Sequence, residues 1–208
     1  MDGNSQSITQ TQFKLSDLNL DNHKLFGYFA KNGFQRDLVP IIPLNSKMNP
    51  FTKIKEGGKT PGWPSQNGWG GLKNWSEYVA SNEEIQYIDD IAESFATQSA
   101  GVGLKTERIP FIDVDIDGDA DLVRNIFQLA VKLLGKSSVR KRKDSTRIGI
   151  PYRLADWDIF TKCVIDFGQS GKVELLGKGQ QFVAIGNHKS GNAYEWFPDL
   201  GLGKLVYE

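Results

Sequence analysis

The stretch Phe111-Ile112-Asp113-Val114-Asp115-Ile116-Asp117 alternates strictly between apolar residues and aspartate. Side chains on a β-strand point alternately to the two faces of a sheet, so the stretch predicts a strand with Ile112, Val114 and Ile116 in a core. The three aspartates then share the other face, about 7 Å apart along the strand. Like charges on one face do not stabilise a strand, so the pattern indicates a cation there, most simply a divalent metal ion.

The residues alone leave two other interpretations of this strand open. The acidic run and Gly118 match the first half of a calcium-binding EF-hand loop. That loop needs glutamate at its twelfth position, where this chain has Arg124, and a strand conflicts with a helix-flanked loop. The aspartates would alternatively serve only to keep an exposed edge strand soluble.

Composition restricts the kind of metal ion and the kind of protein. The chain has 208 residues, 39% of them hydrophobic and 24% charged, which is enough for one sizeable core. Its single cysteine, Cys163, excludes an internal disulfide and a thiolate zinc cluster, and two histidines are too few for most zinc sites. An oxygen-bound Mg²⁺ or Mn²⁺ ion is therefore expected. The sequence has neither a bilayer-spanning apolar stretch nor a signal peptide, so we expect a cytoplasmic protein without a membrane partner.

Apolar periodicity predicts helices and strands in an irregular order. Helices are expected over 16–33, from a capping box at Ser81 onward, and over 120–134 with Leu122, Ile126, Leu129 and Leu133 on one face. Further strands are expected at 37–44, 147–153, 162–167, 172–176, 181–185 and 194–197. This order lacks a regular βαβ rhythm and favours an α+β fold with a largely antiparallel sheet. We expect one domain over 16–208, preceded by a flexible segment over 1–15.

Positive charge gathers in one segment of a chain whose formal net charge is zero. Eight basic residues lie between 132 and 153 against one aspartate, and they are Lys132, Lys136, Arg140, Lys141, Arg142, Lys143, Arg147 and Arg153. Such a segment is either a solvated loop after a helix or a binding site for phosphate groups. A second feature is the long glycine-rich loop over 45–73, in which Trp63 and Trp69 are candidates for stacking on the bases of a nucleic acid.

Two single residues add to the candidate site. Glu174 lies in an apolar strand pattern and is either an ordinary outward-facing residue or the third carboxylate that a two-metal site needs. His188 lies in the turn Gly186-Asn187-His188-Lys189-Ser190-Gly191. On spacing alone, a single histidine in a turn is more often structural than catalytic.

Several motifs follow one another in an order that a known family shares. They are Val39-Pro40, Lys59-Thr60-Pro61 with Trp63, Gly101-Val102-Gly103-Leu104, Ile112-Asp113-Val114-Asp115, Arg147-Ile148-Gly149 with Tyr152-Arg153, and VELLGKGQQFVAIGNHKSGNAYEW over 173–196. Together they resemble the N-terminal catalytic domain of bifunctional DNA primase–polymerases. These enzymes belong to the archaeo-eukaryotic primase superfamily and occur in phages, plasmids and mobile elements. The resemblance covers roughly 27–196, and the last segment and the D-x-D strand are its most specific parts.

The resemblance implies a fold, an activity and a set of site residues. The implied fold is an RRM-like, largely antiparallel catalytic sheet with flanking helices and an accessory N-terminal α/β subdomain. The implied activity is template-directed nucleotidyl transfer with two Mg²⁺ or Mn²⁺ ions per active site. By position, Asp113 and Asp115 match the D-x-D metal ligands, and Glu174 falls at the third carboxylate. The implied nucleotide-binding residues are Arg147, Arg153, His188 and Lys59.

One departure from the family pattern affects the triphosphate contact. Many relatives carry a serine-x-histidine motif between the two acidic motifs, whereas this chain has no histidine between Asp115 and Glu174. We expect Arg147, in its R-x-G segment, to take that place. The family pattern requires only the first two aspartates of the strand, so the duty of Asp117 stays open.

The partners expected from the resemblance are a single-stranded DNA template, nucleoside triphosphates and a helicase region of the kind into which relatives continue. The nucleic acid is expected to contact Arg140, Lys141, Arg142 and Lys143. Two rival functions remain, a metal-dependent nuclease and a non-catalytic replication-initiator module that binds DNA. The R-x-G segment, followed by an isolated glutamate in a strand, favours the polymerase over both rivals.

Overall fold

The computed structural model describes residues 24–94, 100–153 and 160–197. Its helices are α1 (Leu25–Phe29), continued by a π-helical turn (Ala30–Phe34), α2 (Asn82–Ser94) and α3 (Ala120–Leu134). Its strands are β1 (Leu38–Ile41), β2 (Gly62–Trp63), β3 (Gly70–Gly71), β4 (Gly101–Lys105), β5 (Phe111–Ile116), β6 (Val139–Lys141), β7 (Ile148–Pro151), β8 (Cys163–Asp166), β9 (Gly171–Leu176), β10 (Gln181–Ile185) and β11 (Glu195–Phe197).

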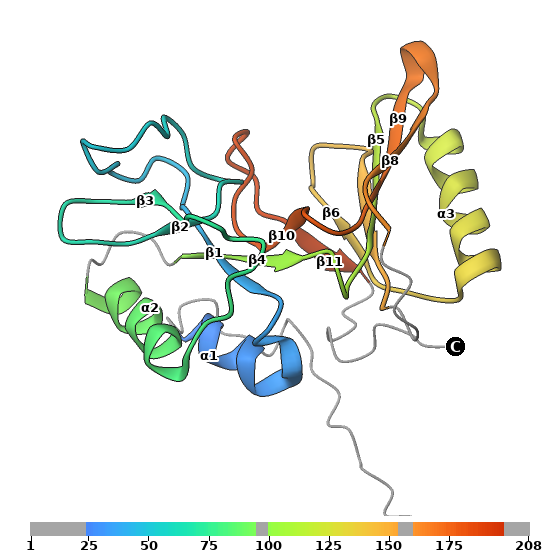
Figure 1. The fold of residues 1–208 in the computed structure, drawn as a ribbon. Helices are drawn as coiled ribbons and strands as arrows, with labels where there is room; N and C mark the ends of the chain where they lie inside the picture. Colours follow the sequence, from blue (N-terminus) through green and yellow to red (C-terminus); the bar gives the residue numbers. More distant parts are fainter. Residues whose placement is uncertain (1–23, 95–99, 154–159, 198–208) are drawn as a thin grey trace, which may run out of the picture.

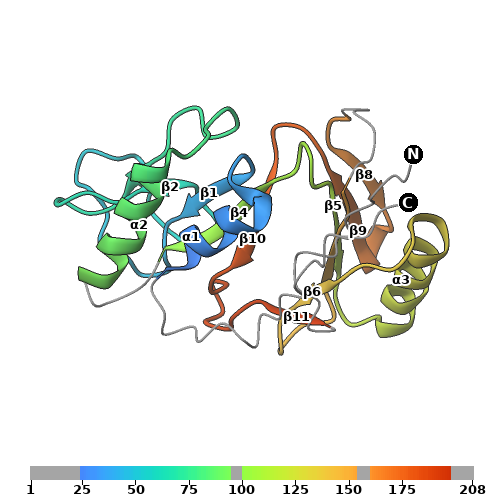
Figure 2. The same ribbon diagram turned by 90° about the horizontal axis from the view of Figure 1, so that it is seen from below.

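Within the described residues these strands form antiparallel sheets, which confirms the predicted α+β class. A three-stranded sheet has the order β1-β4-β10, a six-stranded sheet has the order β11-β6-β7-β5-β9-β8, and β2 and β3 form a small hairpin. Figure 1 shows α1 and α2 beside the three-stranded sheet and α3 beside the six-stranded one. The three-stranded sheet with α1 and α2 is called the three-stranded half below. In both views the six-stranded sheet lies between α3 and this half (Figure 2).

Three chain segments connect the two sheets. They lead from β4 to β5, from β9 to β10 and from β10 to β11. Thr106 ties the first two together, because its N–H donates to the carbonyl of Gln180 at 3.0 Å and its hydroxyl donates to the carbonyl of Gly177 at 2.5 Å. The three-stranded sheet is thus completed by β10, a strand that follows most of the six-stranded sheet in sequence.

The acidic strand has the alternation that its sequence predicts. Ile112, Val114 and Ile116 of β5 are buried under α3, and the aspartates face the other way. Helix α3 is capped at its N-terminus by Asp119, whose Oδ1 accepts a hydrogen bond from the N–H of Leu122 at 2.9 Å. Its bounds are those predicted.

The helix face that carries Leu122, Ile126, Leu129 and Leu133 is buried only in part. Leu129 is 54% exposed and Leu133 is 68% exposed. The helix rests on the sheet through Val123 and Ala130, with Ile126 partly buried beside them. Its apolar residues extend beyond the stripe that one sheet face covers, so the flank with Leu129 and Leu133 faces outward.

The capping box predicted at the start of α2 is confirmed. The N–H of Ser81 donates to Oε2 of Glu84 at 2.8 Å, and the N–H of Glu84 donates to the Ser81 hydroxyl oxygen at 3.2 Å. Asp89 of α2 in turn accepts hydrogen bonds from the N–H groups of Phe26 and Gly27 at 3.0 and 2.8 Å. These bonds satisfy donors at the start of α1 and join the two helices.

Other predictions from the sequence agree with the structure in part. The expected segment over 1–15 and the first part of the helix expected over 16–33 lie outside the described residues. Strand β1 contains Pro40, which its place at a sheet edge allows. The loop expected over 45–73 holds the short β2–β3 hairpin, and β6, which lies within the basic segment over 132–153, is a strand that was not predicted. A membrane-spanning helix, long and apolar enough to cross a bilayer, is not found over 24–94, 100–153 or 160–197.

Candidate active site

One row of residues crosses the six-stranded sheet on the face opposite α3. Arg140 of β6 lies opposite Gly149 of β7, Gly149 lies opposite Asp113 of β5, and Asp113 lies opposite Glu174 of β9. Directly opposed residues in antiparallel strands point to the same side of the sheet. The register therefore places an arginine, an aspartate and a glutamate from distant parts of the sequence on one surface. Asp115, two residues along β5, shares that surface.

The glycine of the R-x-G segment leaves space for an aromatic ring. A Cβ atom at Gly149 would lie 2.0 Å from Cζ of Phe111, closer than any side chain allows. The Phe111 ring in turn lies under the guanidinium of Arg140, whose Cζ is 4.6 Å from the centre of this ring and 4.4 Å from that of Tyr194. Gly149 thus positions the ring on which Arg140 rests.

Arg140 is enclosed between these rings and is only 9% exposed. Its Nη1 donates to the carbonyl oxygen of Val183 at 2.7 Å, and its Nη2 lies 3.7 Å from Oδ1 of Asp113. The burial of Arg140 leaves little of its guanidinium accessible for the nucleic-acid contact expected from the sequence. Its position instead provides a fixed positive charge beside Asp113.

Asp113 lies in a setting that opposes its ionisation. Burial raises the pKa of Asp113 above its usual range, the positive charge of Arg140 works against this, and the negative charge of Asp115 adds to it. Its side chain is nevertheless 27% exposed, and that of Asp115 is 29% exposed. Two partly exposed carboxylates on one face of a strand are suitable ligands for a hard cation.

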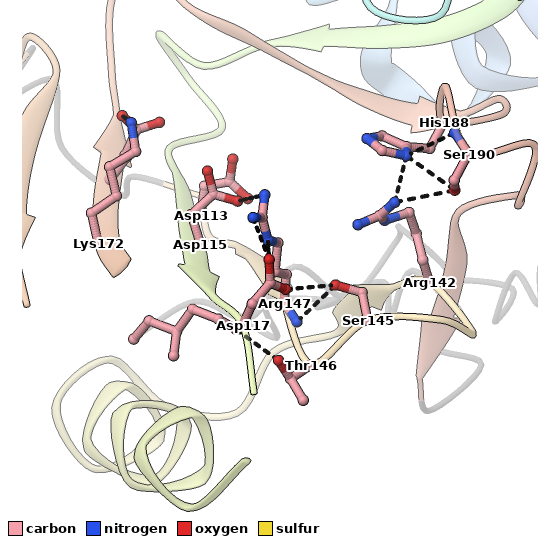
Figure 3. A network of polar contacts seen from close by, with 12 residues as sticks. Asp113, Asp115, Asp117, Arg142, Ser145, Thr146, Arg147, Lys172, His188 and Ser190 are labelled. Carbon is pink, nitrogen blue, oxygen red and sulfur yellow. Dashed lines mark hydrogen bonds and ion pairs between the residues drawn. The ribbon is translucent and has the colours of Figure 1, made fainter. Parts of the chain in front are cut away.

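Arg147 is held by the second and third aspartates of the strand (Figure 3). Its Nη1 donates to Oδ1 of Asp115 at 3.0 Å, and its Nε donates to Oδ2 of Asp117 at 2.9 Å. The hydrogen bonds from Arg147 are the main reason that the pKa of Asp117 lies below its usual value. The open question about Asp117 thus has a structural answer, since this exposed carboxylate orients Arg147.

Glu174 faces two lysines. Lys162 and Lys172 place their Nζ atoms 2.8 and 2.7 Å from Oε1 of Glu174. Burial works to raise the pKa of Glu174, but the hydrogen bonds from the two lysines outweigh it and lower the pKa. Sequence reasoning missed these partners, although Lys172 lies two residues before Glu174 and so must share its face of the strand.

His188 forms a separate polar cluster with Arg142 and Ser190 (Figure 3). Nη1 of Arg142 donates to Nδ1 of His188, and the N–H of Ser190 donates to the same atom at 3.2 Å. Burial, followed by the charges of Arg142 and Lys59, lowers the pKa of His188 to about 4. The imidazole is therefore neutral near pH 7, with Nδ1 accepting and Nε2 carrying the proton.

An open pocket brings most of these side chains together. It is lined by Lys59, Asp113, Asp115, Arg140, Lys141, Arg142, Arg147, Ile148, His188 and Tyr194. Three of the predicted site residues lie outside this lining. Arg153 places its guanidinium 5.6 Å from the centre of the Phe34 ring, Lys143 is exposed on the surface, and Glu174 is turned to its lysines.

The donor set fits the expected metal ions in part. Asp113 and Asp115 offer carboxylate oxygens to the pocket, as Mg²⁺ or Mn²⁺ requires. Within residues 24–94, 100–153 and 160–197, no three His, Cys, Asp or Glu side chains are gathered closely enough to hold a metal ion. The two aspartates thus fit as ligands, and Glu174 fits as a third only where its lysine contacts give way.

Comparison of the chain with protein-family models and with curated proteins finds no match in either case. The chemistry of the pocket is therefore the ground on which a function can be proposed.

Proposed function

We propose that this protein is a template-directed nucleotidyltransferase, a DNA primase–polymerase that uses two Mg²⁺ or Mn²⁺ ions. The observation that supports this proposal is the pairing of opposite charges in one pocket, where Asp113 and Asp115 face Arg142, Arg147 and Lys59. Carboxylates recruit divalent cations, and arginines and lysines bind phosphate groups. A metal–nucleoside triphosphate complex carries both kinds of charge and suits such a pocket.

The chain's own residues have separate tasks in this proposal. Asp113 and Asp115 hold the metal ions, with Glu174 as the third carboxylate. Bound ions of this kind would lower the pKa of a 3′-hydroxyl group and stabilise the leaving pyrophosphate. Arg147 and Arg142 bind the triphosphate and hold it in line for attack. His188, neutral and with its Nε2–H free of the Arg142 contact, donates a hydrogen bond to the sugar or to a phosphate.

The arrangement of the sheets supports the finer part of the proposed fold. In this proposal the six-stranded sheet with α3 on one face is an RRM-like catalytic sheet, and its open face carries the pocket. The three-stranded sheet with α1 and α2 is the accessory N-terminal subdomain. Lys59 and His188 come from segments that adjoin this half, so nucleotide binding would use both parts.

Nucleotide incorporation on primed and unprimed single-stranded DNA, with Mg²⁺ or Mn²⁺, tests the proposal directly. The double variant Asp113→Asn/Asp115→Asn should abolish incorporation, because it keeps the shape of both side chains and removes both charges. The matched control is Asp121→Asn on α3, where the side chain is 81% exposed and pairs with Arg124. Incorporation by the double variant, or none by the wild type with either metal, would overturn the proposal. DNA degradation by the wild type without triphosphates would identify a nuclease instead.

A further inference from the structure

Phe51 is the most exposed large apolar side chain among the described residues, at 90%. It belongs to the segment Asn45–Lys59, which follows β1 and is named the basic loop below. The two tryptophans expected to stack on bases, Trp63 and Trp69, are partly buried. Trp63 stacks on Tyr87 with ring centres 5.7 Å apart, and Trp69 packs against the core of the three-stranded half. Phe51 is therefore the aromatic ring that this region offers to solvent.

The backbone beneath Phe51 is fixed although its ring is uncovered. Asn49 accepts hydrogen bonds through Oδ1 from the N–H of Phe51 at 2.9 Å and through its carbonyl from the N–H of Thr52 at 3.0 Å. The N–H of Asn49 donates to the carbonyl of Trp69 at 2.8 Å, which ties the turn to the β2–β3 hairpin (Figure 1). A ring held on an ordered turn loses little conformational entropy when it binds a partner.

The charge around Phe51 identifies the class of partner. The basic loop contains four lysines, which are Lys47, Lys53, Lys55 and Lys59, and one acidic residue, Glu56. All five of these side chains are exposed. Aromatic rings that stack on bases, combined with basic residues that follow the phosphates, are how proteins bind single-stranded nucleic acid. A protein partner would instead favour a contiguous apolar patch, whereas Phe51 lies between Asn49-Pro50 on one side and Thr52-Lys53 on the other.

The basic loop ends at the candidate active site. Lys59 lines the pocket, and its carbonyl accepts a hydrogen bond from Nε2 of Gln181 in β10 at 2.8 Å. The N–H of Gly58 donates to the carbonyl of Ile42 at 2.7 Å, which fixes this end of the loop beside β1. A chain of eight residues spans at most roughly 29 Å, so the backbone of Phe51 lies within that distance of the backbone of the pocket residue Lys59.

We infer that Phe51 and the lysines of the basic loop form a binding site for single-stranded DNA, in which the Phe51 ring stacks on a base. Its role as a site for the template strand rests on the proposed function, but the binding itself needs neither metal nor triphosphate. The lysines supply the salt-dependent part of the affinity, and the ring supplies the part that does not depend on salt.

Fluorescence anisotropy of a labelled oligothymidylate, measured in EDTA, tests this inference. Phe51→Ala should weaken binding at least about fivefold, since stacking on one base contributes that much or more. Phe51→Trp should bind as the wild type does, because it keeps an aromatic face, whereas Phe51→Leu should be as weak as Phe51→Ala. The matched control is Leu133→Ala, which removes another exposed apolar side chain, at 68% exposure, from α3.

The lysines have a separate readout. Lys53→Gln/Lys55→Gln should reduce the slope of log affinity against log salt concentration by about 1.4, because each phosphate that a lysine neutralises adds about 0.7 to this slope. Wild-type affinity in Phe51→Ala, full affinity in Phe51→Leu, or no DNA binding by the wild type would each overturn the inference. If the Phe51 variants bind DNA as expected but the wild type incorporates no nucleotide, the DNA-binding site is supported and the proposed function is overturned. If the wild type incorporates nucleotides but Phe51→Ala binds DNA normally, the proposed function is supported and the DNA-binding site is overturned.

Discussion

Nη2 of Arg140 lies 3.7 Å from Oδ1 of Asp113. Strand β7 lies between the strands of these two residues, and the β7 residue opposite both is Gly149, which has no side chain. The guanidinium reaches across this glycine with its faces covered by two aromatic rings. At this separation Arg140 compensates the charge of Asp113 without occupying its oxygen in a short hydrogen bond. The carboxylate therefore stays available to a ligand in the pocket while a buried cation limits the free-energy cost of its ionisation.

Replacing Arg140 by methionine should destabilise the fold by about 3 kcal/mol, because it leaves the Val183 carbonyl without its donor and the Asp113 charge without its buried partner. Lys141→Met is the neighbouring control. It removes only a cation–π contact with Phe197 at 3.9 Å and should cost less than about 1 kcal/mol. Urea unfolding measures both changes. An equal loss in the free energy of unfolding for the two variants would contradict the inference that the buried contacts of Arg140 stabilise the fold.

The Arg140–Asp113 pair can also be tested by a double-mutant cycle. Adding Asp113→Asn to Arg140→Met should remove the uncompensated charge and recover part of the loss, with a coupling free energy of about 1 kcal/mol. Simple additivity of the two single substitutions in urea unfolding would contradict an energetic link between these side chains.

Gly149→Ala should destabilise the protein by roughly 1–3 kcal/mol through overpacking, because the new Cβ would meet the Phe111 ring. That ring cannot easily move, since it stacks on Phe182 with ring centres 4.1 Å apart. Gly70→Ala is the matched control, because a Cβ at this strand glycine meets nothing within 4 Å. Thermal unfolding compares the two variants. A tolerated alanine at 149 would mean that the glycine is not needed for the ring.

Protonation of His188 should destabilise the fold. Its pKa is about 4 in the folded protein against 6.5 for an unperturbed histidine, chiefly because of burial and then of Arg142. Between these values the unfolded chain binds more protons than the folded one, so the His188 contribution to stability is complete above pH 6.5 and is lost as the pH falls toward 4. His188→Gln should therefore lose less stability than the wild type over this range in urea unfolding.

The same titration can be followed at the residue itself. The chain has two histidines, so proton NMR should show two imidazole titrations, and the one missing from His188→Gln should have a midpoint near 4. A midpoint near 6.5 for that resonance would contradict the neutral imidazole in the Arg142 cluster.

Arg147→Ala should separate metal binding from nucleotide binding, if the proposed function holds. It removes the cation that pairs with Asp115, so calorimetric titration with Mn²⁺ alone should show tighter binding than in the wild type. Binding of a triphosphate should weaken about tenfold or more, because the variant cannot form charge-assisted hydrogen bonds to phosphate. Asp117→Asn is the control, since it weakens the contact of Arg147 with residue 117 but keeps the arginine's charge and its pairing with Asp115. A parallel rise or a parallel fall of both affinities in Arg147→Ala would contradict this division of roles.

The sequence predicts best the elements whose signals are local. The alternation in β5 and the Ser81–Glu84 capping box each involve residues within a few positions of one another, and both are confirmed. The exposure of Leu129 and Leu133 on α3 does not follow from the sequence, because both have helical spacing but the sheet beneath does not extend to them.

The candidate site depends more on residues that are distant in sequence. The run Val139-Arg140-Lys141 is short and basic and gives no strand signal, yet it becomes β6, which lies between β11 and β7 in the sheet. Arg140 is buried by rings from other parts of the sequence, which are those of Phe111, Phe182 and Tyr194. Similarly, Trp63 is covered by Tyr87 of α2, which the polar loop sequence around Trp63 cannot reveal.

The position of β10 has a consequence for how the chain is made. During translation β1 and β4 leave the ribosome well before β10, because all residues of β5 to β9 are synthesised between β4 and β10. Until residues 181–185 emerge, one side of β4 presents unpaired backbone groups, the kind of edge that recruits strands from other molecules. A nascent chain arrested after β9 should therefore depend on chaperones to stay monomeric, whereas one released after β10 should not.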